Sequence, residues 1–463
     1  MRALVLTPAK SLPRGIDAVL STLESRGFRV DCRPTPAQGA ADVTIVWGGA
    51  GEPARSAYVV NPVDAVQRSR SPAEASLFLT WHGIPVAPDH LPRGVARPVH
   101  RLPADEFLPL KVHVGDLRVL AVEEDPQKEP GLNLSPWKYQ RIMEAACRAV
   151  YVLGLHFACV HLKVHPKGPW HVERVDPCPQ VDEELGRAYG SSIAHLAQVV
   201  NEGPFHQREA TLGADPEFAL AGDDGRILYA SRYLQHRGEV GYDRQSRGQR
   251  GTVFPLAEIR PNPSPSPLVL ARNVERALRH AQMYLPTRRA KWMAGSNPMS
   301  RFPTGGHVHI SGVPLSTPLL LALDTYVAIP MMLLERRTRA RQRRRKYGRM
   351  GDFRRKEHGG FEYRTLPSWL VSPAATRAAL CLVKTVVTEW PSLPADPLRL
   401  AGAVKEFYLG KKSRFRLVFP KLWRKVRATP TGETYAYELA YIHRMVTSGE
   451  EWNDDADIKS AWW

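Results

Sequence analysis

The feature that most constrains this chain is a set of four short segments in which two ionisable residues stand two positions apart. The four pairs are Asp215 with Glu217, Glu258 with Arg260, His307 with His309, and Glu362 with Arg364. Because side chains alternate between the two faces of a β-strand, this spacing puts both members of a pair on one face. The residue between them is apolar or proline and points toward a core. The pattern predicts one antiparallel sheet that is apolar behind and ionisable in front.

The ionisable face of this predicted sheet carries the groups that phosphoryl transfer needs. Carboxylates and histidine nitrogens bind Mg²⁺ or Mn²⁺, and such ions neutralise charge on ATP phosphates during transfer. Arginines hold a phosphoryl group through paired hydrogen bonds. A salt-bridged, solvent-exposed face is the alternative explanation for any single pair. Four pairs within one stretch of chain favour a functional site.

The length of 463 residues suits two domains. Residues 1–205 alternate strand and helix patterns, which is typical of an α/β domain. Beyond a link at Gly203 and Pro204, short strands are separated by Pro- and Gly-rich turns, with long helices between them. One of these helices is expected over residues 317–339. We therefore predict an α/β domain over residues 1–205 and an α+β domain over residues 206–463 that includes C-terminal helices.

The motif order of the second half resembles that of a known superfamily. D-x-E, E-x-R, G-G-H-x-H, an arginine-rich loop containing Y-G-x-x-G and a final E-x-R occur in this sequence. This order is similar to that of the glutamine synthetase and glutamate–cysteine ligase superfamily, and most similar to the phage-type COOH–NH2 ligases (amidoligase type 2). The resemblance covers residues 210–375. It implies a glutamine-synthetase-like sheet with flanking helices, and an ATP- and Mg²⁺- (or Mn²⁺-) dependent ligase that works through an acyl phosphate.

The resemblance also assigns roles to individual residues. The metal ligands it implies are Asp215, Glu217, Glu258, His307 and Glu362. The family usually has glutamate where this chain has Asp215, which implies a weaker or water-mediated contact with the metal. The implied nucleotide contacts include His309, Arg364 and Arg260, and the implied catalytic residues are Glu258, Arg364 and Asp243. Asp243 would lie on a substrate loop.

A strongly basic run, residues 336–356, lies between the histidine strand and the last E-x-R. Such runs are typical of solvated helix faces or nucleic-acid patches. The position between two predicted active-site strands favours phosphate binding by part of the run. We predict Arg349 and Arg354 as contacts to ATP or to an acyl phosphate. The arginines nearer the start of the run suit an acidic polymeric substrate equally well.

The first half resembles an ATP-grasp domain, in residues 58–62 and 153–177. In that family the last strand carries metal-binding residues, and the matching positions here are Glu173 and Asp176. Two departures stand out: His161 replaces an expected acid, and residues 86–110 are too few for a nucleotide lid. We therefore predict a degenerate ATP-grasp-like domain that binds substrate or serves as a scaffold. Surface ion pairs at Glu173 and Asp176 are the alternative.

Composition and net charge favour an anionic binding partner but do not identify which one. Hydrophobic residues at 43% and charged residues at 24% describe an ordinary globular protein. A net charge of +18 favours an anionic partner. The most apolar run, residues 317–334, is interrupted by Asp324 and Pro330, so we expect no membrane partner. The start lacks the pattern of a signal peptide, and we expect a cytoplasmic protein.

Several questions of function stay open at this point. The expected substrate is a small molecule, a peptide or an acidic polymer. The superfamily often forms rings or dimers, so a homo-oligomer is one alternative, but the sequence does not indicate the oligomeric state. A nucleic-acid partner is disfavoured but stays an alternative. Two other functions fit the same residues: a phosphotransferase of guanidino-kinase type, and a non-enzymatic polyanion-binding protein. Residues 452–463 alternate acids with tryptophans, and they form either a docking tail or a packed terminus.

Overall fold

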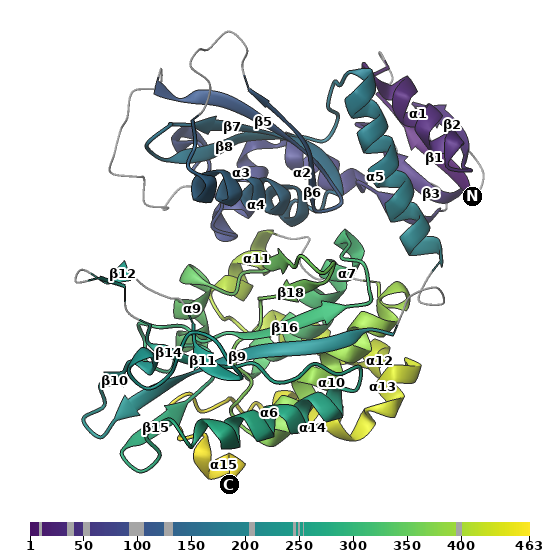
Figure 1. Cartoon of the computed structure of the whole chain (residues 1–463). Coiled ribbons are helices and arrows are strands. Elements are labelled where there is room, and N and C mark those ends of the chain that lie inside the picture. Colours follow the sequence, from purple (N-terminus) through teal and green to yellow (C-terminus); the bar gives the residue numbers. More distant parts are fainter. Residues whose placement is uncertain are drawn as a thin grey trace. The chain divides into compact units, whose positions relative to one another are not determined.

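The chain folds into two compact units, Met1–Gly203 and Pro204–Trp463 (Figure 1). The structure is a computed structural model. It describes residues 1–8, 12–34, 41–49, 56–91, 106–124, 133–202, 209–243, 247–248, 251–252, 254–394 and 401–463.

The first unit contains two four-stranded sheets. A parallel sheet has the order β2-β1-β3-β4 and an antiparallel sheet the order β6-β5-β7-β8. The strands are β1 (Arg2–Leu6), β2 (Arg29–Arg33), β3 (Ala41–Val46), β4 (Ser56–Val60), β5 (Leu108–Gly115), β6 (Arg118–Glu124), β7 (Phe157–Val164) and β8 (Trp170–Asp176). The helices are α1 (Ile16–Ser25), α2 (Val63–Arg70), α3 (Pro72–Trp81), α4 (Pro136–Val152) and α5 (Glu183–Glu202). The alternating pattern predicted for this half is confirmed.

Three aromatic side chains join the elements of the first unit into one core. Trp47 follows β3, Phe157 begins β7, and Tyr189 lies on α5. The rings of Trp47 and Phe157 are stacked with centroids 4.7 Å apart, and Tyr189 packs edge-on against Trp47 at 5.4 Å. Stacked and edge-to-face contacts of this kind add to the free energy gained by burial.

The residues singled out for the ATP-grasp resemblance lie on neighbouring strands. His161 lies on β7, while Glu173 and Asp176 lie on β8. Asp176 pairs with Arg174, with 3.3 Å between Oδ2 and Nη1, so the ion-pair alternative is realised at this position. The segment expected to be too short for a nucleotide lid falls largely, over residues 92–105, outside the described residues.

The second unit is built on an antiparallel sheet with the order β11-β14-β9-β16-β18-β17, and β10 and β15 pair with β9. The strands are β9 (Thr211–Gly222), β10 (Ile227–Leu228), β11 (Val240–Tyr242), β14 (Leu256–Ile259), β15 (Ala290–Met293), β16 (Gly306–Ser311), β17 (Phe353–Arg355) and β18 (Phe361–Tyr363). A separate hairpin joins β12 (Arg247–Gly248) to β13 (Gly251–Thr252). The predicted antiparallel sheet is confirmed.

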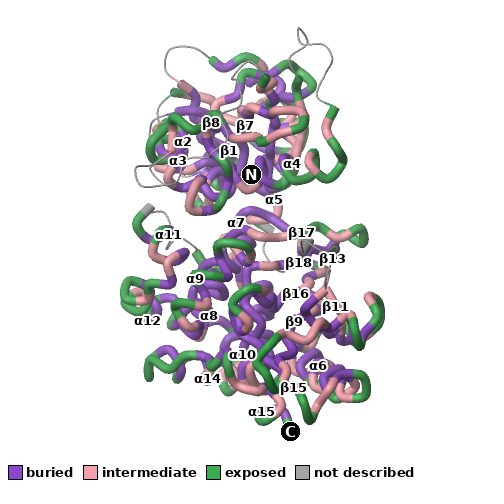
Figure 2. The backbone as a smooth tube through the Cα atoms, turned by 90° about the vertical axis from the view of Figure 1, so that its left-hand side faces the viewer, coloured by how far each residue is buried: buried purple, intermediate pink, exposed green. Residues whose placement is uncertain are grey.

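Helices cover the apolar face of this sheet. Phe218, Val308 and Phe361, each beside one of the ionisable pairs, are at most 1% exposed, as the alternation predicts. In Figure 2 the chain is buried through β9, β16, α8 and α10. The helices are α6 (Pro267–Ala281), α7 (Thr317–Leu323), α8 (Ile329–Leu334), α9 (Arg337–Lys346), α10 (Pro373–Glu389), α11 (Ala401–Tyr408), α12 (Ser413–Arg427), α13 (Pro430–Thr434), α14 (Ala436–Ser448) and α15 (Lys459–Trp462).

The helix expected over residues 317–339 is shorter than predicted. A single turn of π-helix, η5 (Asp324–Ala328), joins α7 to α8, and the run ends at Leu334. Glu335 is extended because its buried carboxylate pairs with Arg344, and α9 begins only at Arg337. Within the described residues, Thr317–Leu334 is the one helix long and apolar enough to cross a membrane. It is 89% buried inside the structure, as core helices also are.

The C-terminal segment is a packed terminus. Its backbone bonds to the rest of the unit, from Trp452 N to Leu334 O at 2.7 Å and from Ile458 N to Trp292 O at 2.8 Å. The Trp462 indole N–H donates to Leu370 O at 2.8 Å, and this side chain is buried. This segment therefore completes the core of the second unit.

Replacing Trp462 by alanine should lower the free energy of unfolding of the second unit by about 3–5 kcal/mol, because it removes a buried aromatic ring. The matched control is Tyr437→Ala, since Tyr437 is 85% exposed; it should change that free energy by less than about 0.5 kcal/mol. Urea unfolding of both variants measures the difference. Equal stability of the two would show that the terminus does not contribute to the core.

Candidate active site

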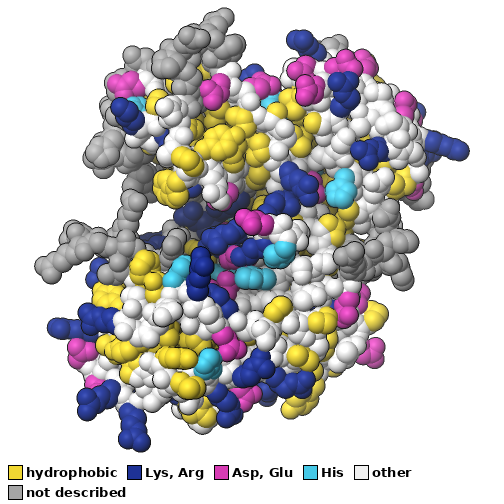
Figure 3. All heavy atoms as spheres, viewed as in Figure 1, with side chains coloured by type: hydrophobic (Ala, Val, Ile, Leu, Met, Phe, Trp, Pro, Cys, Tyr) yellow, Lys and Arg dark blue, Asp and Glu magenta, His cyan; other side chains and the backbone are white. Residues whose placement is uncertain are grey.

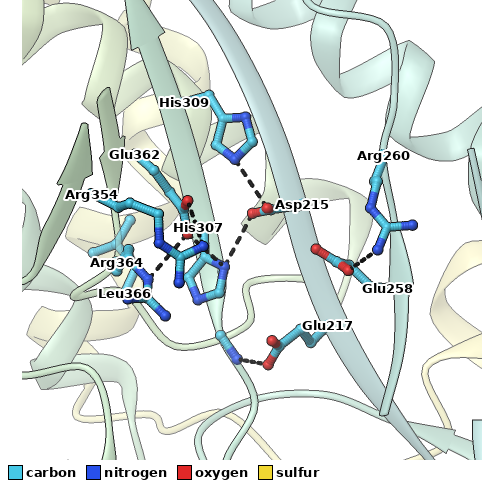
Figure 4. A network of polar contacts seen from close by, with 12 residues as sticks. Asp215, Glu217, Glu258, Arg260, His307, His309, Arg354, Glu362, Arg364 and Leu366 are labelled. Carbon is cyan, nitrogen blue, oxygen red and sulfur yellow. Dashed lines mark hydrogen bonds and ion pairs between the residues drawn. The ribbon is translucent and has the colours of Figure 1, made fainter. Parts of the chain in front are cut away.

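Strand register places the predicted site residues on one face of the sheet. Glu258 on β14 lies opposite Glu217 on β9, and His307 on β16 lies opposite Asp215 on β9. Across the next pair of strands, His309 lies opposite Glu362 on β18. Residues opposite one another in a ladder have neighbouring side chains on the same face. Figure 4 shows these side chains gathered together, and Figure 3 shows histidines among acidic and basic side chains on the surface of the second unit.

Two glycines let strand β16 begin close to its neighbours. The backbone N–H of Gly305 donates to Oε2 of Glu217 at 2.7 Å. A Cβ at Gly306 would clash with the carbonyl of Pro367 and the ring of Trp369. The Gly-Gly pair before the histidines thus serves close packing of backbone, which a larger residue would prevent.

Asp215, His307 and Glu362 form the tightest group on this face. One potential ligand atom of each lies within 4.8 Å of the other two. His307 Nδ1 is 3.1 Å from Asp215 Oδ1 and 3.5 Å from Glu362 Oε1. His309 reaches the other oxygen of Asp215, with 3.0 Å from Nε2 to Oδ2. These atoms are the oxygen and imidazole ligands that bind Mg²⁺ and Mn²⁺ in proteins.

Glu217 and Glu258 add negative charge that the protein only partly compensates. Glu217 is fully buried, and within the described residues its Oε1 has no hydrogen-bond partner. Burial, followed by the carboxylates of Asp243 and Glu258, raises the pKa of Glu217 well above its usual range. Burial and the Asp215 carboxylate raise the pKa of Glu258 to about 9, although Arg260 opposes this shift. Divalent cations would supply the missing positive charge, so the residues fit a metal site.

Asp215 differs from the two glutamates. Burial alone would raise the pKa of Asp215, but the two histidines outweigh burial and hold this pKa well below its usual range. Asp215 is therefore an anion between two imidazoles. It lies next to Glu217 and Glu258 on the same sheet face. That placement suits a carboxylate that takes part in more than one metal contact.

Basic side chains from β17 and from the ends of β14 and β18 lie beside the acids. Arg364 Nε is 3.1 Å and Lys356 Nζ 2.7 Å from the carboxylate of Glu362. Arg354 is 3.6 Å from the same carboxylate and is half exposed. Arg260 pairs with Glu258, and its guanidinium occupies the space that a side chain at Gly241 would need. Three of these residues, Arg364, Arg354 and Arg260, were predicted as nucleotide contacts. They lie on the sheet face that carries Asp215, Glu217, Glu258 and Glu362, which we call the acid face.

Two other predicted residues have different surroundings. Arg349 donates from Nη2 to the carbonyl of Arg345 on α9 at 3.0 Å, and its own carbonyl accepts from the Thr365 hydroxyl. Its contact with nucleotide stays a prediction. Asp243 directly follows β11, close enough to Glu217 to raise the pKa of that carboxyl. The catalytic role of Asp243 likewise stays a prediction.

Two polar residues of the site were not predicted from the sequence: Tyr347 contacts His307, and Lys356 contacts Glu362. A third residue, buried Asp324, lies behind the sheet. It accepts from Gly351 N at 2.6 Å and, at 2.7 Å, from the hydroxyl of Tyr363, whose side chain points away from the ionisable face. Lys356 stands two positions after Arg354, the same spacing that identified the four pairs. Asp324 is an acid inside an apolar run, and it lies in a π-helical turn, a feature found frequently at functional sites.

Part of the start of the basic run is structural, and the use of its exposed arginines for an acidic polymer stays a prediction. Arg343 is fully buried and donates to the carbonyls of Thr304 at 3.0 Å, Thr365 at 2.9 Å and Leu366. It thereby ties the segment before β16 to the segment after β18. Arg344 forms a buried ion pair with Glu335, and Arg336 and Arg339 pair with Asp455. Arg337, Arg341 and Arg345 are exposed.

Arg343→Lys should lower the free energy of unfolding by about 3–5 kcal/mol, because lysine cannot reach three carbonyls and each lost charged hydrogen bond costs about 1.5–3 kcal/mol. The matched variant on the exposed face of α9 is Arg341→Lys, which should change the free energy by less than about 0.5 kcal/mol. Denaturant titration compares the two. If both variants were equally stable, the clamp formed by Arg343 would have no energetic role.

Mn²⁺ should stabilise the second unit if the acid face binds metal. At a concentration about 100 times the dissociation constant, a ligand that binds only the folded state adds about 2.7 kcal/mol. Thermal unfolding with increasing MnCl₂ should show this gain in the native chain and lose it in Asp215→Asn. Glu275→Gln, on the surface of α6, is the control that should keep the gain. An identical gain in Asp215→Asn would place any bound Mn²⁺ elsewhere.

Comparisons with solved structures give weak similarities. The ATP-grasp ligase PsnB, in complex with precursor peptide PsnA2 and AMPPNP, is 12% identical with a TM-score of 0.30, over 42% of this chain and 96% of that chain. Macrocyclase MdnB from Microcystis aeruginosa MRC is 12% identical with a TM-score of 0.29, over 42% and 99%. A bifunctional glutathione synthetase from Pasteurella multocida is 11% identical with a TM-score of 0.35, over 58% and 52%.

The sequence comparisons address the second unit. No curated protein matches the chain. Residues 212–463, more than half of the chain, match the family described as phage phiEco32-like COOH.NH2 ligase-type 2. This stretch contains all the ionisable pairs of the acid face and the helices behind it. The chain belongs to the phage phiEco32-like COOH.NH2 ligase-type 2 family.

Proposed function

We propose that this protein is an ATP- and Mg²⁺- (or Mn²⁺-) dependent ligase that forms an amide bond between a carboxylate and an amine. The observation that carries the proposal is the group of Asp215, His307 and Glu362, with potential ligand atoms within 4.8 Å of one another. Glu217 and Glu258 lie on the same sheet face, in a chain of a carboxylate–amine ligase family.

The residues divide into two sets of proposed metal ligands. Asp215, His307 and Glu362 form the first set, and Glu217 and Glu258 extend it toward β14. Bound divalent ions would supply positive charge that neutralises the charge developing on the ATP phosphates. Arg364 and Arg354, beside Glu362, are placed to donate hydrogen bonds to a phosphoryl group, and Arg260 could do so beside Glu258.

The proposed reaction has two steps. First, a substrate carboxylate oxygen attacks the γ-phosphorus of ATP, the bond to the bridging oxygen breaks, and ADP leaves. The product is an acyl phosphate. Second, the amine nitrogen attacks the acyl carbon, the carbon–oxygen bond to phosphate breaks, and phosphate leaves as the amide forms. Asp243 is the proposed acceptor of the proton that the amine loses.

The protein's own contribution is positioning and electrostatic stabilisation. Guanidinium groups fixed at the sheet edge stabilise charge as the phosphoryl group transfers, without reorganising during the reaction. The strands hold reacting groups in one place, which lowers the entropic part of the barrier. The substrate class proposed is a small molecule, a peptide or an acidic polymer, and the first unit is proposed to bind substrate or act as a scaffold.

Glu217→Gln, Glu362→Gln and Arg364→Lys should each lower ATP-dependent amide formation by at least about 10²-fold. The glutamine variants remove the negative charge of a proposed metal ligand, and lysine at position 364 keeps its charge but loses the paired hydrogen bonds of the guanidinium. Glutamine at position 217 keeps an acceptor for the Gly305 N–H, so the fold should persist. The controls are Glu275→Gln and Arg279→Lys, which alter an exposed ion pair on α6 and should leave turnover unchanged.

The assay is incubation with ATP, Mg²⁺ and a pool of amino acids and peptides, followed by mass measurement. Ligation gives products lighter by one water than the sum of their parts. Native turnover in all three site variants would refute the proposal. ADP with a stable phosphorylated product and no amide would indicate the phosphotransferase alternative. Binding of polyanions that needs no Mg²⁺ and falls steeply with salt would indicate the non-enzymatic one.

A further inference from the structure

The hydroxyl of Tyr347 stands between two residues of the proposed site. It contacts Nε2 of His307, and Nη2 of Arg364 donates to it at 2.8 Å. Arg364 in turn lies 3.1 Å from Glu362, which lies 3.5 Å from His307 Nδ1. The four side chains therefore form a closed ring of polar contacts in which Tyr347 connects the histidine to the arginine.

The two nitrogens of His307 face different partners. Nδ1 faces the carboxylates of Asp215 and Glu362, whereas Nε2 faces Tyr347. A histidine nitrogen binds a metal through its lone pair, so it must carry no proton, and the other nitrogen then carries the proton and needs an acceptor. If Asp215, His307 and Glu362 share a metal, Nδ1 is the ligand atom and Tyr347 is the acceptor.

A tyrosine hydroxyl suits this position because it can both donate and accept. Arg364 can only donate, so one lone pair of the hydroxyl oxygen is used by Arg364. The second lone pair can accept the Nε2 proton of His307. Without metal, the hydroxyl can instead donate to Nε2, which leaves the imidazole proton on Nδ1, where it bonds to Asp215. The same two atoms stay in contact in both states.

The surroundings of Tyr347 hold its hydroxyl in place. Its ring packs edge-on against His307 with centroids 5.4 Å apart, and the guanidinium of Arg364 lies 5.0 Å from the ring centroid. The next residue, Gly348, has a φ of 66°, and a side chain there would collide with the guanidinium of Arg343. Because Arg343 is fixed by three carbonyls, the backbone beside Tyr347 is fixed as well.

We propose that Tyr347 is a positioning residue of the metal site: it orients His307 so that Nδ1 is presented to the metal, its hydroxyl oxygen accepts a hydrogen bond from the Nε2–H of His307 when metal binds, and it connects His307 to Arg364. This inference rests on the proposed function, because it needs a metal at Asp215, His307 and Glu362. It assigns the link between the metal ligand and the phosphate-binding arginine to one hydroxyl group.

The first test is Mn²⁺ binding to the purified full chain without nucleotide, followed by electron paramagnetic resonance. Tyr347→Phe keeps the ring and removes the hydroxyl, and it should weaken Mn²⁺ binding by about 10–100-fold, the usual effect of losing the partner of a ligating histidine. The matched control is Tyr326→Phe, because Tyr326 is also buried and its hydroxyl donates to Pro394 O at 2.6 Å. This control should bind Mn²⁺ as the native chain does.

The second test is a nuclear magnetic resonance measurement of which ring nitrogen of His307 carries the proton. In ¹⁵N-histidine-labelled native protein with Mg²⁺, with the His307 signals assigned by comparison with His307→Asn, the proton should be on Nε2. In Tyr347→Phe with Mg²⁺ this preference should be lost. A proton on Nδ1 in the Mg²⁺-bound native protein would overturn the inference. The measurement on the native protein can still overturn the inference if Tyr347→Phe fails to fold, which circular dichroism would show.

The outcomes separate the inference from the proposed function. If the native chain binds no Mn²⁺, or if His307→Asn binds it equally well, the metal site and the inference fall together. If His307→Asn loses Mn²⁺ while Tyr347→Phe matches Tyr326→Phe, the metal site stands and only the role of Tyr347 is refuted. If His307→Asn loses Mn²⁺ binding, and Tyr347→Phe binds Mn²⁺ more weakly while Tyr326→Phe does not, both the metal site and the role of Tyr347 are supported.

Discussion

The main constraint on the second unit is that four carboxylates lie together on one face of its sheet, and their negative charge must be compensated. Glu217, Glu258 and Glu362 are nearly inaccessible to solvent, the side chain of Asp215 is 13% exposed, and strand register makes the four carboxylates neighbours. Burying carboxylates is costly unless opposite charge lies close by. Histidines contact Asp215, and basic side chains pair with Glu362 and Glu258. The pKa values of Glu217 and Glu258 are nevertheless raised. Bound divalent cations, as proposed above, would supply the positive charge that these two glutamates lack.

A rigid scaffold keeps these charges together. Arg343 joins the segments that flank β16 and β18, and the π-helical turn at Asp324 holds Gly351 and Tyr363 in place. Asp454 accepts from the backbone N–H groups of Ser296 and Asn297. The C-terminal segment and the core helices thus support the strands that carry the site. Much of the strong positive charge in residues 336–346 serves this structure.

The sequence predicted the sheet and its two faces because side-chain alternation depends only on spacing along one strand. It did not predict the register that puts Glu258 beside Glu217, since register depends on pairing between distant segments. Tyr347 and Asp324 were missed because their partners are brought close only by the fold. The break at Glu335 was missed for the same reason: its cause is a buried ion pair with Arg344. The basic run could not be divided into buried and exposed arginines before α9 was placed against the sheet.

An anomalous diffraction map from crystals of the full chain grown with Mn²⁺ and ADP would show directly whether the acid face binds metal. We expect a manganese peak within coordination distance, about 2.0–2.3 Å, of Asp215, His307 Nδ1 and Glu362. An ordered second unit with ADP bound and no manganese at these three side chains would contradict it.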